Sequence, residues 1–321
     1  MPWRVIVRNR RALACVAWLI ATACLVVFLI NFDARAALQQ IGRAKPLWVL
    51  CALFANFLIL PLLTEQWSRL LPKSAPMRWK VLWECVTLGI AAMNTLPFGS
   101  GHAVALGFLS RRSPKGLPGA VSLLALEQLC EGFAKLALLF AALAVAPLPD
   151  PLPRIGWTIG AALAVGTGVL VWVVNHPRQG EGSRGWRAKW STHLEVIRKP
   201  QLFVTAVGLS VLMKVCELAS IIAVQRSLEV DLPVTTAPLI LAVVTLASAF
   251  SITPGNLGVY ETAAFGVYRF LGVPADVAIA LGVVQHASYL LPIVGAGYLL
   301  TIWRTFSPAP VIVSDAPDTI R

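Results

Sequence analysis

The chain has 321 residues, of which 57% are hydrophobic and only 13% are charged, and its mean hydropathy is +0.74. This composition excludes an ordinary soluble domain, because too few polar residues remain to cover its surface. The net charge of +12 would suggest nucleic acid in a soluble protein. In a membrane protein it indicates orientation and contact with anionic lipid headgroups, and we expect no nucleic-acid partner.

Six apolar runs are long enough to cross a membrane as helices. They are residues 12–31, 46–64, 119–146, 156–174, 202–225 and 277–302. The first run follows a basic start but is too long for a signal peptide and lacks a cleavage site, so we interpret it as a membrane anchor.

The same unusual passage occurs twice. VTLGIAAMNTLPFGSG covers Val86–Gly101, and VTLASAFSITPGNLG covers Val244–Gly258. Each copy is apolar for about two turns and then breaks at a proline, with a glycine four residues further on. Paired interruptions of this kind in two halves of a chain are typical of transporter binding sites.

The apolar pieces around the two breaks are too short to span comfortably. They are residues 81–96, 100–110, 238–253 and 257–271. We therefore predict an all-α polytopic membrane protein with about six full spans and two re-entrant helical hairpins. The alternative is eight ordinary spans, with both breaks as loops.

The positive charges set the expected topology. Under the re-entrant arrangement, nineteen Lys and Arg residues lie on the cytoplasmic side and six lie outside. The hairpins then enter from opposite sides, so residues 81–146 and 238–302 form an inverted repeat within one membrane domain, 1–305. Both termini are predicted to be cytoplasmic in a bacterial inner membrane. We expect a cytoplasmic polar linker at 176–201 and a disordered tail at 306–321.

Several ionisable residues fall inside the apolar segments, where each needs a partner or a function. Glu131 and Lys135 are spaced i,i+4, and Lys214 and Glu217 are spaced i,i+3, so local pairing can explain all four. Glu127 shares a helix face with Glu131 and has no evident local partner, which makes it a better functional candidate.

Two further candidates follow the breaks directly. Glu261 would lie in the first turn of the returning half-helix, where the helix dipole favours a carboxylate, or in a polar cavity. His102 holds the corresponding place after the first break and could be a hydrogen-bonding residue, bind phosphate or relay protons. Two half-helix N-termini meeting at this point would suit an anionic group such as a lipid phosphate.

No soluble-enzyme signature is present: there is no P-loop, no dinucleotide-binding glycine motif and no metal-spaced His or Cys cluster. The six cysteines lie in apolar segments without disulfide or metal spacing. We expect no cofactor, no metal and no catalytic residue set that the sequence can specify.

Three passages resemble a known family. LPFGSGHAVALGFLSRR, LEQLCEGFAKLALL and ITPGNLGVYETAAFGVYRFLGVPADVAIALGVV are similar to the membrane region of the lysylphosphatidylglycerol synthase/flippase family, which hopanoid-associated proteins also carry. The family pattern P-x-G-x-G-x-x-E maps onto Pro254, Gly258 and Glu261. In the first half of the chain, Pro97 and Gly101 match the corresponding family pattern.

The family has a second pattern in the first half of the chain, and Glu127 matches it. Departures from the family are His102 in place of Glu, Ala105 and Gln128 in place of Arg, and Glu131 in place of Asp. They remove two positive charges from the implied headgroup site, which favours a more neutral lipid. Because the chain as given ends without an aminoacyl-transferase domain, the resemblance implies lipid translocation or binding rather than aminoacyl transfer.

We therefore expect a translocase for a lipid or lipid-linked substrate. The alternatives are a membrane-embedded lipid-modifying enzyme, and a subunit or scaffold for a separate lipid-synthesis enzyme. The expected ligand is an anionic phospholipid, a hopanoid or a lipid-linked headgroup. The candidate binding residues are Pro97, Gly99, Gly101, His102, Glu127, Glu131, Pro254, Gly255, Gly258 and Glu261.

Overall fold

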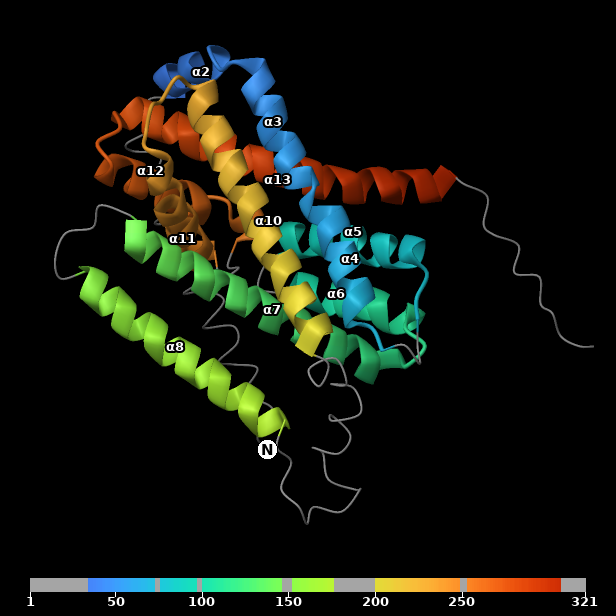
Figure 1. Cartoon of the computed structure of the whole chain (residues 1–321). Helices are drawn as coiled ribbons and strands as arrows, with labels where there is room; N and C mark the ends of the chain where they lie inside the picture. Colours follow the sequence, from blue (N-terminus) through green and yellow to red (C-terminus); the bar gives the residue numbers. More distant parts are fainter. Residues whose placement is uncertain are drawn as a thin grey trace, which may run out of the picture.

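The computed structural model describes residues 34–72, 76–96, 100–145, 152–175, 200–248 and 253–306 (Figure 1). Within these ranges every regular element is helical, which confirms the all-α prediction. The predicted span 12–31, the linker from 176 to 199, the break residues Pro97 and Gly99, and the tail from 307 lie outside the described residues.

The elements in chain order are α2 (Ala34–Gly42), α3 (Pro46–Phe57), α4 (Ile59–Leu70), α5 (Trp79–Thr95), α6 (Ser100–Arg112), α7 (Gly116–Val145), α8 (Leu152–Asn175), α10 (Pro200–Ser227), the 3₁₀ turn η1 (Val234–Thr236), α11 (Ala237–Ser248), the 3₁₀ turn η2 (Pro254–Asn256), α12 (Val259–Phe270) and α13 (Ala275–Phe306).

Four helical segments are long and apolar enough to cross a membrane. They are Pro46–Leu70, which combines α3 and α4, Gly116–Val145, Gln201–Ser227 and Ala275–Phe306. These confirm four of the six predicted spans. The predicted span at 156–174 forms α8, which contributes only a shorter apolar stretch, Gly156–Gly166. The total of six spans therefore stays a prediction.

The first repeated passage forms a tight antiparallel helix pair. Gly101 on α6 lies against α5 so closely that an added Cβ would come within 2.4 Å of the carbonyl oxygen of Ala92. Gly89 on α5 faces Ala105, at 3.1 Å from an added Cβ to the Ala105 Cβ. Glycine thus allows the two backbones to approach, as small residues do between membrane helices.

The second repeated passage also forms paired helices. α11 and α12 pack against each other on either side of η2, and they share a core with α10 and α13. The two short pairs predicted from the sequence therefore exist as helical hairpins. Their re-entrant path through a membrane, and the inverted orientation, stay predictions.

Prolines shape two of the long segments. Pro61 lacks the N–H that would bond the carbonyl of Phe57, and the helix is interrupted at Leu58, between α3 and α4. Pro292 lies inside α13, which continues on both sides of it. The carbonyl it leaves free, that of Ser288, accepts a hydrogen bond of 3.0 Å from Nδ2 of Asn56 on α3.

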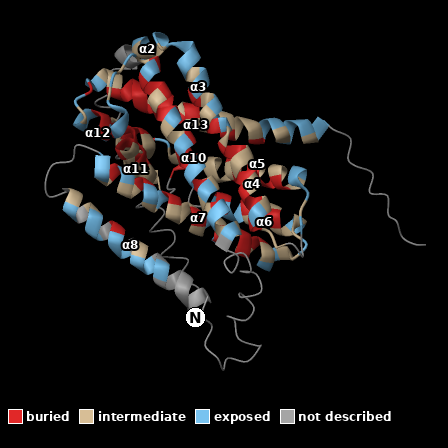
Figure 2. Cartoon of the chain, in the orientation of Figure 1, coloured by how far each residue is buried: buried red, intermediate tan, exposed pale blue. Residues whose placement is uncertain are grey.

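Two hydrophobic cores lie along α10 and α13. One packs α4, α5, α6 and α7 against the first part of α10, and the other packs α11 and α12 against its second part. Figure 2 shows buried residues gathered where these helices meet and exposed residues along α8. Large apolar side chains such as Leu47, Phe54, Val204 and Leu299 remain exposed on the outside, as expected of a lipid-facing surface.

Helix α8 lies antiparallel along α7 (Figure 1). The rings of Phe140 and Trp157 stack with their centroids 5.2 Å apart. Gly160 faces Phe140 so closely that an added Cβ would lie 2.7 Å from its ring.

Candidate functional site

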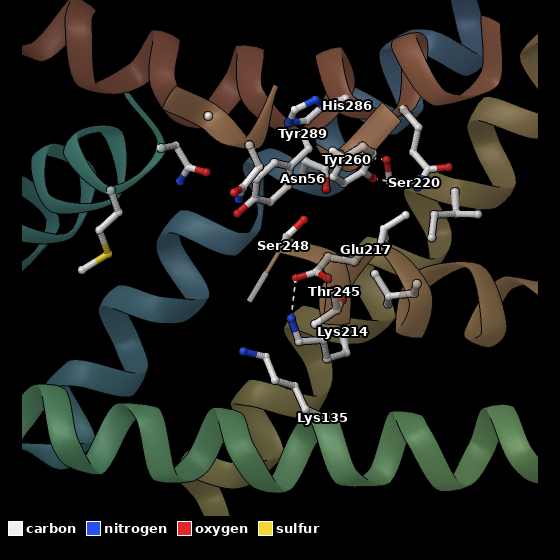
Figure 3. Close-up of a pocket in the computed structure, with 18 of the residues that line it drawn as sticks. Asn56, Lys135, Lys214, Glu217, Ser220, Thr245, Ser248, Tyr260, His286 and Tyr289 are labelled. Atoms are coloured by element: carbon white, nitrogen blue, oxygen red, sulfur yellow. Dashed lines mark hydrogen bonds and ion pairs between the residues drawn. The ribbon is translucent and has the colours of Figure 1, made fainter. Parts of the chain in front are cut away.

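A polar cavity of about 330 Å³ lies between the two hydrophobic cores (Figure 3). Its lining residues on α10 run from Lys214 to Ile221, and those on α13 run from Gln285 to Tyr289. On each helix they are flanked by the two cores: Met213 and Ile293 belong to the first core, and Val224 and Val284 belong to the second. Its polar lining is Asn56, Asn94, His102, Gln128, Glu131, Lys135, Lys214, Glu217, Ser220, Thr245, Ser248, Asn256, Tyr260, Gln285, His286 and Tyr289.

The two broken passages touch each other at this cavity. Gly255 of η2 has φ +61, and a Cβ there would lie 3.0 Å from the carbonyl oxygen of Asn94 near the end of α5. Asn256 follows with φ 54, which asparagine tolerates better than most residues. Glycine at 255 therefore serves both the left-handed backbone and the close contact between the breaks.

Four charged side chains form one network at one end of the cavity. Nζ of Lys214 lies 2.8 Å from Oε1 of Glu131 on α7 and 2.8 Å from Oε1 of Glu217 on its own helix. Lys135 reaches the same Glu131 oxygen at 3.5 Å. The sequence predicted two separate local pairs; the structure keeps both and adds the Lys214–Glu131 contact between α7 and α10.

A buried carboxylate and imidazole hold the second break in place. Oε2 of Glu261 accepts a hydrogen bond of 2.7 Å from the N–H of Gly258, which caps the start of α12. The other oxygen, Oε1, lies 2.7 Å from Nδ1 of His286 on α13. The ring of Tyr260 stacks on that imidazole at 4.1 Å between centroids. Glu261 thus combines its capping role with a bond to a cavity-lining residue.

Uncharged polar groups dominate the other end of the cavity (Figure 3). The amide of Gln285 donates to the Tyr260 hydroxyl at 2.7 Å and accepts from the Tyr268 hydroxyl at 2.8 Å. Asn56 donates to Oγ of Ser220 at 2.7 Å. The cavity therefore has an ionic end and a neutral hydrogen-bonding end.

The predicted site residues do not all line the cavity. His102, Glu131 and Gly255 line the cavity. Gly101, Gly258 and Glu261 lie behind its wall, in helix packing or capping, and Pro254 starts η2 half-buried. Glu127 is not among the lining residues and its carboxylate accepts a bond from Gln128 at 3.1 Å. Pro97 and Gly99 lie outside the described residues.

Much of the lining was not among the predicted site residues. The lining residues that were missed include His286, together with Lys214 and Glu217, whose spacing predicts only a local pair. Asn56 was not singled out, although a polar amide inside a spanning run of apolar residues was a usable signal. The described part of the chain brings no three His, Cys, Asp or Glu side chains together in a way that could hold a metal ion.

A comparison with protein families gives one informative match. The model described as "Lysylphosphatidylglycerol synthase TM region" matches residues 13–297, which is most of the chain and agrees with the resemblance seen in the sequence. A comparison with curated proteins gives no match to the chain.

Proposed function

Since the chain belongs to the lysylphosphatidylglycerol synthase transmembrane-region family, we propose that this membrane protein takes the headgroup of a lipid or lipid-linked molecule into its central cavity and moves it between leaflets. Family and apolar helices together indicate a membrane protein with a lipid-related role. Translocation, the inner-membrane location and the cytoplasmic termini are part of the proposal.

The observation that carries the proposal is a cavity with charged walls inside an apolar helical body. An ionisable side chain at bilayer depth costs about 2.5–3.5 kcal/mol on insertion scales. Four such side chains here share one cavity with two histidines. Pairing offsets part of that cost, but it does not require a cavity around the pairs, whereas a polar headgroup does.

The contact between the breaks supports alternating access. In the proposed mechanism, the α5–α6 and α11–α12 hairpins separate at Asn94 and Gly255 on one side of the bilayer and close on the other. Among the described residues no hydrogen bond joins Gly255 to Asn94, so separating these two residues breaks none. The lipid chains would stay in the bilayer while the headgroup passes through the cavity.

The test uses the full chain reconstituted in vesicles with trace lipids that carry a fluorophore on an acyl chain. Dithionite bleaches only the outer leaflet, so the bleached fraction reports movement between leaflets. We expect Lys135→Met, which changes a half-exposed cavity side chain, to slow movement by at least about tenfold relative to the parent. Equal rates in protein-free and protein-containing vesicles would refute translocation.

A matched control is available on α4. Glu65 and Arg69 form an exposed i,i+4 pair away from the cavity, so Glu65→Gln should move lipid at the parent rate. Mass spectrometry of the vesicle lipids after the assay distinguishes the alternatives. A chemically altered lipid would indicate a lipid-modifying enzyme, and lipid that binds without moving would indicate a scaffold.

A further inference from the structure

The charged residues that line the cavity balance one another. Lys135 and Lys214 carry two positive charges, Glu131 and Glu217 carry two negative charges, and these are the only Lys, Arg, Asp or Glu residues among the described lining residues. A headgroup with a net charge would therefore leave one charge without a partner in an apolar setting. The balance favours a headgroup whose own charges sum to zero.

Lys135 is the cation with capacity for a new anion. Lys214 is held at 2.8 Å by two carboxylates and its side chain is 10% exposed. Lys135 makes a longer contact of 3.5 Å and its side chain is 45% exposed. An ammonium has three donors, so Lys135 can bind a phosphate oxygen without breaking the buried network.

Two buried polar atoms on the second broken passage can accept hydrogen bonds from a ligand. Asn256 and Ser248 line the cavity, and Oδ1 of Asn256 and Oγ of Ser248 are buried without a hydrogen-bond partner among the described residues. The side-chain nitrogen of Asn94, across the break, donates to the carbonyl of Ile90 at 3.0 Å, and no hydrogen bond joins it to Asn256 or Ser248 among the described contacts. Because an amide oxygen can only accept, its partner must be a donor.

The two requirements lie in one cavity. Figure 3 shows Ser248 between the ion pairs and the group formed by Tyr260, His286 and Tyr289. We propose that the cavity selects a zwitterionic phospholipid headgroup whose amine carries N–H donors: the phosphate binds Lys135, and the ammonium donates to Asn256 and Ser248. This inference rests on the proposed headgroup binding and adds the substrate class.

Three phospholipids separate the elements of the inference. Phosphatidylethanolamine has no net charge and carries N–H donors. Phosphatidylcholine has no net charge and lacks N–H donors, and phosphatidylglycerol has hydroxyl donors with one net negative charge. Each is compared with an acyl-chain fluorophore in the vesicle assay, and in short-chain form by thermal shift of the full-length protein in detergent.

We expect phosphatidylethanolamine to bind and move at least about tenfold better than the other two, as is expected when a buried acceptor would otherwise stay unpaired. Equal movement of all three would overturn the inference and leave translocation standing. Preferential binding of phosphatidylethanolamine with no movement would support the inference and refute translocation. A preference for phosphatidylglycerol or phosphatidylcholine would overturn it.

Asn256→Gly is the decisive variant, because glycine adopts φ 54 without strain and removes only the amide. The preference for phosphatidylethanolamine over phosphatidylcholine should fall to within about twofold, as the unpaired acceptor is gone. Ser248→Ala should reduce it as well. Ser122→Ala is the matched control, since Ser122 is buried on α7, bonds the Pro118 carbonyl and lies outside the cavity. An Asn256→Gly protein with the parent preference would overturn the inference.

Discussion

The side-chain amide of Asn56 donates to the carbonyl oxygen of Ser288 at 3.0 Å, the acceptor that Pro292 leaves without its helical N–H. A polar residue on α3 thus compensates a proline in α13, 236 positions later in the chain. This bond joins the two long helices beside the cavity and explains how a buried amide can be favourable in an apolar segment.

The first prediction concerns this compensation. Asn56→Leu should lower the free energy of unfolding by about 1–3 kcal/mol, because it leaves the Ser288 carbonyl unpaired. In a Pro292→Ala background, the restored N–H can bond that carbonyl, so the cost should fall by at least about 0.5 kcal/mol. Reversible unfolding in mixed micelles measures both. Strict additivity of the two changes would contradict the explanation. Ser220→Ala controls for the second bond of Asn56, at 2.7 Å.

The second prediction concerns the ion network. Lys214→Met should destabilise the protein by about 3–5 kcal/mol, since two carboxylates with side chains only 16–17% exposed lose their closest cation. The double variant Lys214→Met/Glu217→Leu should recover only part of this loss, because Glu131 retains only the longer contact to Lys135. Adding Glu131→Leu should recover more. The same unfolding assay applies. Full recovery in the double variant would show that the Lys214–Glu131 contact between α7 and α10 does not stabilise the protein.

The third prediction concerns Glu261 and His286. A carboxylate that only capped α12 would be worth about 0.3–1 kcal/mol. Because Glu261 also bonds His286, Glu261→Gln should cost about 1–3 kcal/mol. His286→Leu in the Glu261→Gln background should cost less than in the parent, since the two residues share one bond. Independent costs in unfolding measurements would argue against a shared bond.

The fourth prediction concerns the packing of α5 against α6. Gly101→Ala places a Cβ at 2.4 Å from the backbone of Ala92 and Met93, so it should cost about 1–3 kcal/mol or more. Gly107→Ala is the control on the same helix, because its Cβ meets nothing within 4 Å. That control should be neutral or stabilising by up to about 1 kcal/mol. In thermal unfolding in detergent, the Gly101→Ala variant should unfold at a lower midpoint temperature than the Gly107→Ala variant. Similar midpoints would contradict the close packing of Gly101 against α5.

The fifth prediction concerns membrane topology, which the inverted repeat requires. Ser113 follows the α5–α6 pair, and Ala275 starts α13 after the α11–α12 pair. Single cysteines at these two positions, in a background without the six native cysteines, should react with an impermeant thiol reagent from opposite sides of the membrane. Labelling of both positions from the same side would contradict the inverted repeat and the alternating-access proposal that depends on it.

The sequence determined the helical class, four of the spans and the two hairpins around the breaks. Each depends on local information: the length of an apolar run, its interruption by proline and glycine, and the i,i+3 and i,i+4 spacing that pairs Lys214 with Glu217 and Lys135 with Glu131. The family resemblance, carried by short motifs, was equally readable and is confirmed by the match over residues 13–297.

Only the tertiary structure decided which polar residues meet. Glu127 and Glu131 share one helix face, yet Glu131 lines the cavity and Glu127 does not. The contacts Lys214–Glu131, Glu261–His286 and Asn56–Ser288 each join helices that are distant in the sequence. Helical periodicity defines the face on which a residue lies, but the partner of that face depends on how the helices cross, and the crossing is set by side-chain packing along their whole length.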